Sequence, residues 1–277
     1  MSDNAYSLAR SARPFSLVVA LVSSGLGLYL GMRETHAPLL LVVAVLVAGL
    51  LMQLGVNLIN DKGDLESSPP VATGSRRQIL FNYRMGIVSF CLAIGIGLVL
   101  VLFRGWPLLA IGVIGVLGAF AYTTEPFNYK RRALGVVLVF WLMGVLMVLG
   151  AYLSVTGRFS WTVVWHALPV SCLVSLLLLS NEIRDFERDR EAGVRTLTVR
   201  IGLEAARNLY WVLLLLAFLL AAGVGVEIGL SRFPWLLMPL PLIVPIRRWL
   251  YADQRRPLPP WTGRFLLLFG VGYALAL

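Results

Sequence analysis

The sequence predicts an all-α integral membrane protein, with residues 1–277 forming a single transmembrane domain. Of the 277 residues, 58% are hydrophobic and only 14% are charged, and the mean hydropathy is +0.82. A soluble domain does not need this balance to fill a core. The apolar residues fall into segments of about 15 to 25 residues, the length that a helix needs to cross a bilayer, whereas the strands of a barrel would be shorter.

Nine apolar segments stand between charged or Gly/Pro-rich stretches, and each is a predicted span. The first is longer than the core of a signal peptide and lacks an obvious cleavage site, so it should be retained. The eighth contains four prolines and should be bent, and the ninth is short for a full crossing. The predicted spans are 15–32, 38–60, 82–103, 107–123, 134–155, 161–182, 208–229, 233–250 and 263–277.

The basic residues predict the orientation of these spans. Twenty of the 24 Lys and Arg residues lie on the side of the N-terminus, and only Arg33, Arg104, Arg158 and Arg232 lie on the other side. This asymmetry predicts a cytoplasmic N-terminus. The net charge of +10 could also suggest nucleic acid, but the basic residues lie in short loops and not in a compact basic domain. No nucleic-acid partner is therefore expected.

A charged stretch follows the sixth span on the cytoplasmic side. The segment Ser180–Leu197 carries five acidic residues and four arginines directly after an apolar run. If the helix continues through it, Asn181, Asp185 and Asp189 recur every four residues and share one face. Taken alone, this pattern is more typical of a solvated helix end with ion pairs between neighbouring turns.

A second polar stripe, at the end of the second span, favours a functional interpretation. Its side chains should share one helical face over the last three turns of a membrane helix, where ionisable groups are costly and usually functional. The stripe consists of Gln53, Asn57, Asn60, Asp61 and Asp64. Because the two stripes are four spans apart, they suggest an internal duplication, with two helix ends facing each other over a central cavity.

Oxygen ligands on two different helices are suited to Mg²⁺, which one or two carboxylates and substrate phosphates usually hold. Basic residues in the same loops would take the remaining charge of a diphosphate, although orientation and anionic lipid explain most of them. An apolar tunnel with such a site at its mouth would bind a polyprenyl diphosphate, and the lipid bilayer would shield the reacting chain from water. The nearby basic residues are Arg76, Arg77, Lys130, Arg131, Arg132 and Arg195.

A membrane transporter with acidic residues on its ion pathway is the alternative from another class of protein. Its acids should lie near the middle of the membrane and be reachable from both faces. Here the acids cluster at cytoplasmic helix ends and are accompanied by arginines.

At these residues the sequence resembles the UbiA superfamily of intramembrane prenyltransferases, and within it the MenA-like 1,4-dihydroxy-2-naphthoate prenyltransferases. The resemblance extends from Asn57 to Gly202 and implies nine transmembrane helices around a central cavity. The motifs that carry it are Asn57–Asp64, Gly74–Arg76, Tyr122–Gly135, Leu146–Tyr152 and Asn181–Leu197.

The resemblance also implies the roles of individual residues. Mg²⁺ would be held on the prenyl diphosphate by two sets: Asp61 and Asp64 with Asn57 or Asn60, and Asp185 and Asp189 with Asn181. Arg76, Lys130 and Arg195 would contact the diphosphate, and Tyr122 and Arg132 would lie near the reacting end. The implied reaction joins a polyprenyl chain to an aromatic acceptor with loss of CO₂, in menaquinone biosynthesis. The implied location is the bacterial cytoplasmic (inner) membrane, with the active site facing the cytoplasm.

Three departures from the family pattern leave the acceptor open. Val136 stands where the family has Glu after Leu-Gly, Glu182 replaces the second of two paired asparagines, and Glu66 is the only acid in the segment up to Pro70. The alternatives are 4-hydroxybenzoate, another aromatic compound or a lipid head group. An enzyme without an external acceptor, which hydrolyses or cyclises the chain, is a further alternative. Neither the prenyl length nor the oligomeric state follows from the sequence.

Overall fold

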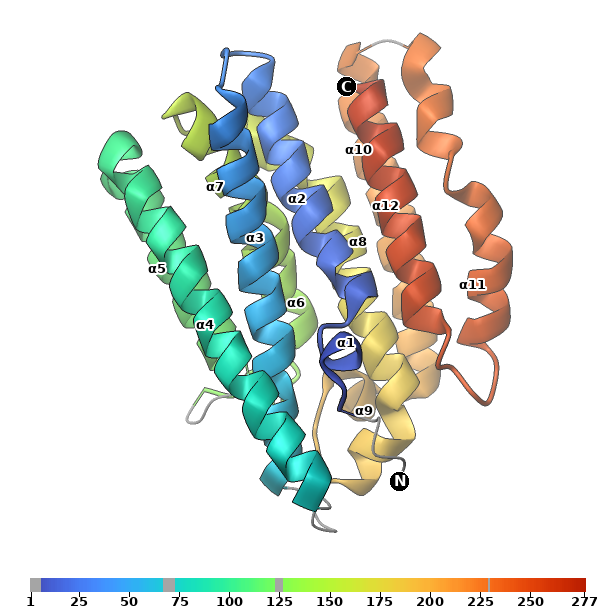
Figure 1. The fold of residues 1–277 in the computed structure, drawn as a ribbon. Coiled ribbons are helices and arrows are strands. Elements are labelled where there is room, and N and C mark those ends of the chain that lie inside the picture. Colours follow the sequence, from blue (N-terminus) through green and yellow to red (C-terminus); the bar gives the residue numbers. More distant parts are fainter. Residues whose placement is uncertain (1–5, 67–72, 123–126, 229) are drawn as a thin grey trace.

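Every regular element in the described part of the chain is helical (Figure 1). The structure is a computed structural model, and it describes residues 6–66, 73–122, 127–228 and 230–277. The elements are α1 Leu8–Ser11, α2 Pro14–Met32, α3 Leu39–Asn60, η1 Asp61–Glu66, α4 Thr73–Arg104, α5 Trp106–Ala121, α6 Gly135–Val139, η2 Phe140–Leu146, α7 Met147–Thr156, α8 Trp161–Glu191, α9 Leu197–Ile201, α10 Leu203–Ile228, η3 Leu230–Leu237, η4 Leu240–Leu242, α11 Ile243–Leu250 and α12 Leu258–Ala276.

The all-α membrane class is confirmed, whereas the count of nine spans stays a prediction. Within the described residues, six helices are long and apolar enough to cross a membrane: α2, α3, α4, the continuous run α6–η2–α7, α8 and α10. Helix α5 is apolar but has only 16 residues. The expected bend is confirmed, because residues 230–250 are divided into η3, η4 and α11. Helix α12 begins at Leu258, and its 19 residues span about 28 Å, close to the thickness of a hydrocarbon core.

Helices α2 and α8 lie at the centre of the bundle. Helix α8 packs against α2, α6, η2, α10 and α12, and α2 packs against α3, α7 and α12. Helices α4 and α5 lie on one side of this centre, and α10, α11 and α12 lie on the other (Figure 1). Because helices surround it, the middle of α8 is buried on all sides from Val170 to Leu177 and lies in the centre of the apolar core.

Helices α4 and α8 extend beyond the predicted spans, and the run α6–η2–α7 departs from regular α-geometry. Helix α4 starts at Thr73, nine residues before the predicted edge, and α8 continues to Glu191 without a break. In the run α6–η2–α7, the segment Phe140–Leu146 is a π-helix. π-helical segments widen the helix locally and are frequent at functional sites. Leu142 and Met143 of this segment line the cavity described below.

Glycines allow α2 and α7 to approach each other very closely. A Cβ atom at Gly27 would lie 2.1 Å from the carbonyl oxygen of Val148 and 2.9 Å from the Cβ of Ala151. Small residues at such crossings let helix backbones pack in membranes, where van der Waals contact drives association. On the same helix, a Cβ at Gly25 would meet no atom within 4 Å.

Gly27→Ala should therefore lower the thermal stability of the purified protein, because the new methyl group would push α7 away from α2. We expect a destabilisation of about 1–3 kcal/mol, the usual cost of overpacking. Gly25→Ala is the matched control and should leave stability unchanged or raise it slightly, because alanine favours the helix. Equal melting temperatures for the two variants would contradict the close approach of α2 and α7.

Candidate active site

The buried amide of Asn57 holds the N-terminal segment across the end of α3. Its Nδ2 donates to the carbonyl oxygen of Ala12 at 2.8 Å and to Oγ of Ser16 at 2.8 Å. Its Oδ1 accepts a long bond of 3.4 Å from Gln53, one turn earlier on α3. Asn57 was predicted to bind metal or substrate. In the structure its side chain also binds one residue on each side of Arg13.

A second buried asparagine, Asn82 on α4, fixes the beginning of the same segment. Its Nδ2 donates to the carbonyl oxygen of Tyr6 and to Oγ of Ser11, both at 2.9 Å. We call residues 6–16 the N-terminal strap. Two asparagines from α3 and α4 therefore hold the strap close to the polar end of α3.

Arg13 of the strap is placed against the first polar stripe. Its backbone is left-handed, with φ 48° and ψ 67°, a conformation that is rare for residues other than glycine. Its Nη2 donates to Oδ1 of Asp61 at 2.9 Å, and the Asp61 side chain is only 9% exposed. With the amide oxygen of Asn60 turned toward the guanidinium, Asn60 accepts from Nη1 at 2.9 Å and from Nη2 at 3.0 Å. The guanidinium of Arg13 thus pairs with two of the predicted metal ligands, Asp61 and Asn60.

The first stripe does not lie on a single α-helical face as predicted. Helix α3 ends at Asn60, and Asp61 begins the 3₁₀-helix η1, which turns more tightly. Gln53, Asn57 and Asn60 lie on the same face of α3 and line one cavity. The side chain of Asp64 lies outside the described residues, so its predicted role as a ligand stays a prediction.

The second stripe lies on one uninterrupted helix, which is the condition on which its common face depended, because α8 extends to Glu191. Asp185 accepts from Nε of Arg184 at 2.8 Å and from its Nη2 at 2.6 Å, and Arg188 adds an ion pair at 3.1 Å. Asp189 is only 6% exposed and pairs with Arg188 at 3.5 Å. The burial of Asp189 argues against a merely solvated helix end, and arginines of the same helix neutralise both acids.

Two buried amide oxygens are without a hydrogen-bond partner near these acids. Oδ1 of Asn181 is one of them, while its Nδ2 donates to the carbonyl oxygen of Leu177 at 3.1 Å. The other is Oε1 of Gln53. Both residues line the same cavity, so the two oxygens stand at the wall of one space. Burying an oxygen without a hydrogen-bond partner costs free energy, unless a ligand supplies the missing contact.

Glu182 joins the end of α8 to the start of α9. Its Oε2 accepts from the backbone N–H of Thr198 at 3.0 Å, and its Oε1 is buried without a hydrogen-bond partner. A Cβ placed on Gly135 would lie 3.6 Å from this free oxygen and 3.6 Å from the ring of Tyr122. The carboxyl group of Glu182 is therefore close to the segment in which Val136 departs from the family pattern.

Backbone hydrogen bonds after α5 hold Lys130 beside Tyr122. The backbone N–H groups of Tyr129 and Lys130 donate to the carbonyl oxygens of Ala121 and Tyr122, each at 3.2 Å. The Tyr122 and Tyr129 rings meet edge to face at 5.1 Å.

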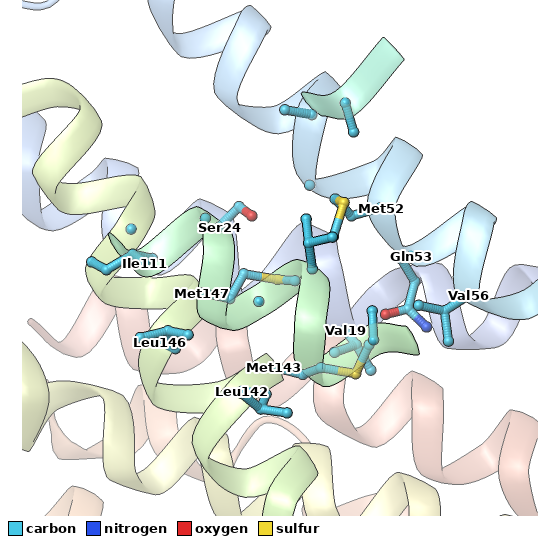
Figure 2. A pocket seen from close by; sticks show the side chains of 18 of the residues that line it. Val19, Ser24, Met52, Gln53, Val56, Ile111, Leu142, Met143, Leu146 and Met147 are labelled. Atoms are coloured by element: carbon cyan, nitrogen blue, oxygen red, sulfur yellow. The ribbon is translucent and has the colours of Figure 1, made fainter. Parts of the chain in front are cut away.

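A cavity of about 490 Å³ has Arg13, Asn57, Asn60, Tyr122 and Asn181 at its polar end and continues between α2, α3, α4, α5 and the α6–η2–α7 helix. Along α3, its lining recurs at helical spacing from Val45 to Asn60, a length of about 22 Å. Figure 2 shows Met52, Met143 and Met147 beside the cavity, with Gln53 at its α3 wall. Beyond the polar end, the walls are mostly aliphatic, which suits a hydrocarbon chain.

The cavity brings together four of the predicted site residues: Asn57, Asn60, Tyr122 and Asn181. Sequence reasoning missed Arg13 as a site residue, because an arginine directly before Pro14 is also what the positive-inside rule predicts. The remaining residues that were predicted to contact the substrate do not line the cavity. Arg76, Arg132 and Arg195 are exposed, and Lys130 is half-buried.

Within the described side chains, no group of three or more His, Cys, Asp and Glu residues could hold a metal ion by itself. This donor set still fits Mg²⁺, because magnesium is usually bound by one or two carboxylates together with substrate phosphates and water. Asp61 and Asp185 supply carboxylates at the ends of two helices. The free oxygens of Asn181 and Gln53 are hard, neutral donors of the type that such a site uses.

Comparison with known proteins agrees with this fold. The model of the UbiA prenyltransferase family matches residues 17–269. The UbiA prenyltransferase domain-containing protein 1 homologue of Drosophila melanogaster is 33% identical over 166 residues, which are 58% of this chain and 45% of that protein. The match thus spans less than half the length of the fly relative. The 1,4-dihydroxy-2-naphthoate octaprenyltransferase of Bacillus subtilis (strain 168) is 27% identical over 236 residues, covering 81% of this chain and 74% of that protein.

A solved structure has the same fold. It is that of a UbiA homologue from Archaeoglobus fulgidus bound to DMAPP and Mg²⁺, with a TM-score of 0.66 and 17% sequence identity. The similarity covers 96% of this chain and 98% of the archaeal one. From the family match and this shared fold it follows that the chain belongs to the UbiA prenyltransferase family.

Proposed function

We propose that this protein transfers a polyprenyl group from a polyprenyl diphosphate to an aromatic acceptor, and that the acceptor is 1,4-dihydroxy-2-naphthoate. One observation carries the proposal: Arg13, Asn57, Asn60 and Asn181 line the polar end of a cavity whose other walls are aliphatic. A diphosphate fits the first environment and its hydrocarbon chain fits the second. The excess of basic residues on the N-terminal side supports an active site that faces the cytoplasm, in a bacterial cytoplasmic membrane.

The two polar helix ends would bind the diphosphate from both sides. Asp61 and Asp185 would hold Mg²⁺ with amide oxygens from α3 and α8, and bound Mg²⁺ would stabilise the negative charge that develops on the leaving diphosphate. Asp64 would be a further metal ligand beside Asp61, and Asp189 would be a further metal ligand beside Asp185. Lys130 supports this arrangement, because it is close enough for its charge to act on the carboxylate of Asp189 on α8.

The aliphatic part of the cavity would keep water away from the reacting carbon. When the allylic carbon–oxygen bond breaks, both electrons leave with the diphosphate, and the positive charge stays on the chain. The face of the buried Tyr122 ring can stabilise such a charge, because aromatic rings attract cations. The neutral phenol would do so without becoming a competing nucleophile.

The relative from Bacillus subtilis supports the naphthoate as the acceptor, because its name states that substrate. A new carbon–carbon bond would form at the ring carbon that carries the carboxylate. The bond to the carboxylate would then break, CO₂ would leave, and the bonding electrons would restore the aromatic ring. The chain lacks the family's glutamate at Val136, and the buried carboxyl group of Glu182 lies beside this segment, with its Oε1 3.6 Å from the place of a Cβ on Gly135.

Membranes containing the protein should join a radiolabelled polyprenyl diphosphate to 1,4-dihydroxy-2-naphthoate in the presence of Mg²⁺. We expect a lipid-soluble product and release of CO₂ from carboxyl-labelled acceptor. Parallel reactions would contain 4-hydroxybenzoate, phospholipid alone or no added acceptor. Product from one of these and none from the naphthoate would overturn the proposed acceptor, and failure of all reactions would overturn prenyl transfer.

Asp61→Asn and Asp185→Asn should each lower the rate of transfer by at least about 100-fold, because each removes a carboxylate that neutralises the metal. The proteins should still insert and elute as the wild type does. Asp253→Asn, on an exposed loop after α11, is the matched control and should keep full activity. Full activity in the Asp61→Asn, Asp185→Asn double variant would contradict the assignment of the diphosphate site.

Gly97→Leu should shorten the part of the cavity that holds the chain. Gly97 lines the cavity near its end away from the acids, and a Cβ there would meet no atom within 4 Å. We expect transfer from a C40 diphosphate to fall by roughly tenfold or more relative to a C10 diphosphate.

Gly95→Leu is the matched control, because Gly95 lies on the same helix, is equally open and does not line the cavity. Its C40 to C10 ratio should equal that of the wild type. If both leucine variants kept the wild-type ratio, the cavity would not be the binding site of the chain.

A further inference from the structure

Arg13 pairs with oxygens that the proposed metal site would use. Its guanidinium contacts Asp61 and Asn60, two of the predicted ligands of the first stripe. It lines the cavity together with Asn181 of the second stripe. It is also close enough to Asp185 of the second stripe for its charge to act on that carboxylate.

The strap holds Arg13 there against its backbone preference. A left-handed backbone is unfavourable for arginine and persists only where the surroundings impose it. Here Asn57 binds the residue before Arg13 and the third residue after it, and Asn82 binds the strap farther upstream. Two buried asparagines on different helices are therefore used to bring one positive charge to Asp61.

The electrostatic reason is clear from the burial of Asp61. A carboxylate that is 9% exposed at the end of a membrane helix is costly without a positive partner. Arg13 is the only positive partner that the described contacts give to Asp61. A divalent cation on Asp61 would meet the guanidinium at a distance at which two positive charges repel each other strongly.

We propose that Arg13 is a displaceable counter-ion of the diphosphate site, an inference that rests on the proposed function. It neutralises Asp61 while the site holds no metal. When Mg²⁺ and a diphosphate bind, Asp61 turns to the metal and the guanidinium moves to the diphosphate oxygens, which it can hold in a bidentate manner. The partly exposed side chain, at 31%, has room for this movement.

The proposal predicts two effects of opposite sign in the purified full-length protein. Arg13→Gln should tighten the binding of Mn²⁺ alone, because the metal no longer competes with the guanidinium. We expect a roughly five- to tenfold lower Kd, measured from the electron paramagnetic resonance signal of free Mn²⁺. With saturating Mg²⁺, the same variant should bind inorganic pyrophosphate roughly five- to tenfold more weakly by calorimetry.

Three further variants make the result decisive. Arg10→Gln removes an exposed charge from the same strap and should change neither affinity. Arg13→Lys keeps the charge but loses the bidentate fork, so its Mn²⁺ affinity should stay near that of the wild type while its pyrophosphate affinity falls. Asp61→Asn should weaken Mn²⁺ binding.

The outcomes separate this inference from the proposed function. If Arg13→Gln leaves Mn²⁺ affinity unchanged or weaker while Asp61→Asn weakens it, the counter-ion role of Arg13 is wrong and the metal site stands. If the Arg13→Gln variant binds both ligands more weakly, Arg13 has only a structural role. If Asp61→Asn leaves Mn²⁺ binding unchanged, the metal assignment of the proposed function fails, and the role of Arg13 fails with it.

Discussion

A carboxylate at the buried end of a membrane helix must be neutralised, and much of the polar architecture of this protein follows from that requirement. Asp61 is paired with Arg13, and Asp185 is paired with Arg184 and Arg188. Each pair costs desolvation energy that its attraction only partly returns. Pairs of this kind are a weak source of stability, so their presence at both helix ends agrees with the proposed binding of a metal ion and a diphosphate.

The rest of the bundle positions these two ends. The glycine contact between α2 and α7 brings helices together beside the cavity, and α8 anchors the second acidic end in the centre of the core. Leu142 and Met143 of the π-helical segment η2 line the cavity. Among the described residues that line the cavity, the one charged side chain is that of Arg13, at the polar end. This asymmetry favours a lipid diphosphate over an ion pathway that is open at both faces.

Periodicity and composition predicted the helical class, the bend near residues 233–250 and the continuous helix that carries Asp185 and Asp189. They could do so because these features depend on local hydrophobicity, proline content and spacing. The meeting of Asn57 and Asn181 at one cavity was predicted from the two matched stripes. The 3₁₀ turn at Asp61 was not predicted, because the pattern alone does not show where an α-helix tightens. The role of Arg13 depends on its distance from Asp61, 48 residues away along the chain, and a lone arginine before a proline gives no sign of such a contact.

The most direct test of this account is a structure of the protein with Mn²⁺ and an unreactive prenyl thiodiphosphate. The anomalous signal of manganese should lie within about 2.5 Å of carboxylate oxygens of Asp61 and Asp185, with the diphosphate between α3 and α8 and the prenyl chain in the cavity beside Met52 and Met147. Manganese bound elsewhere, or a prenyl chain outside this cavity, would contradict the account.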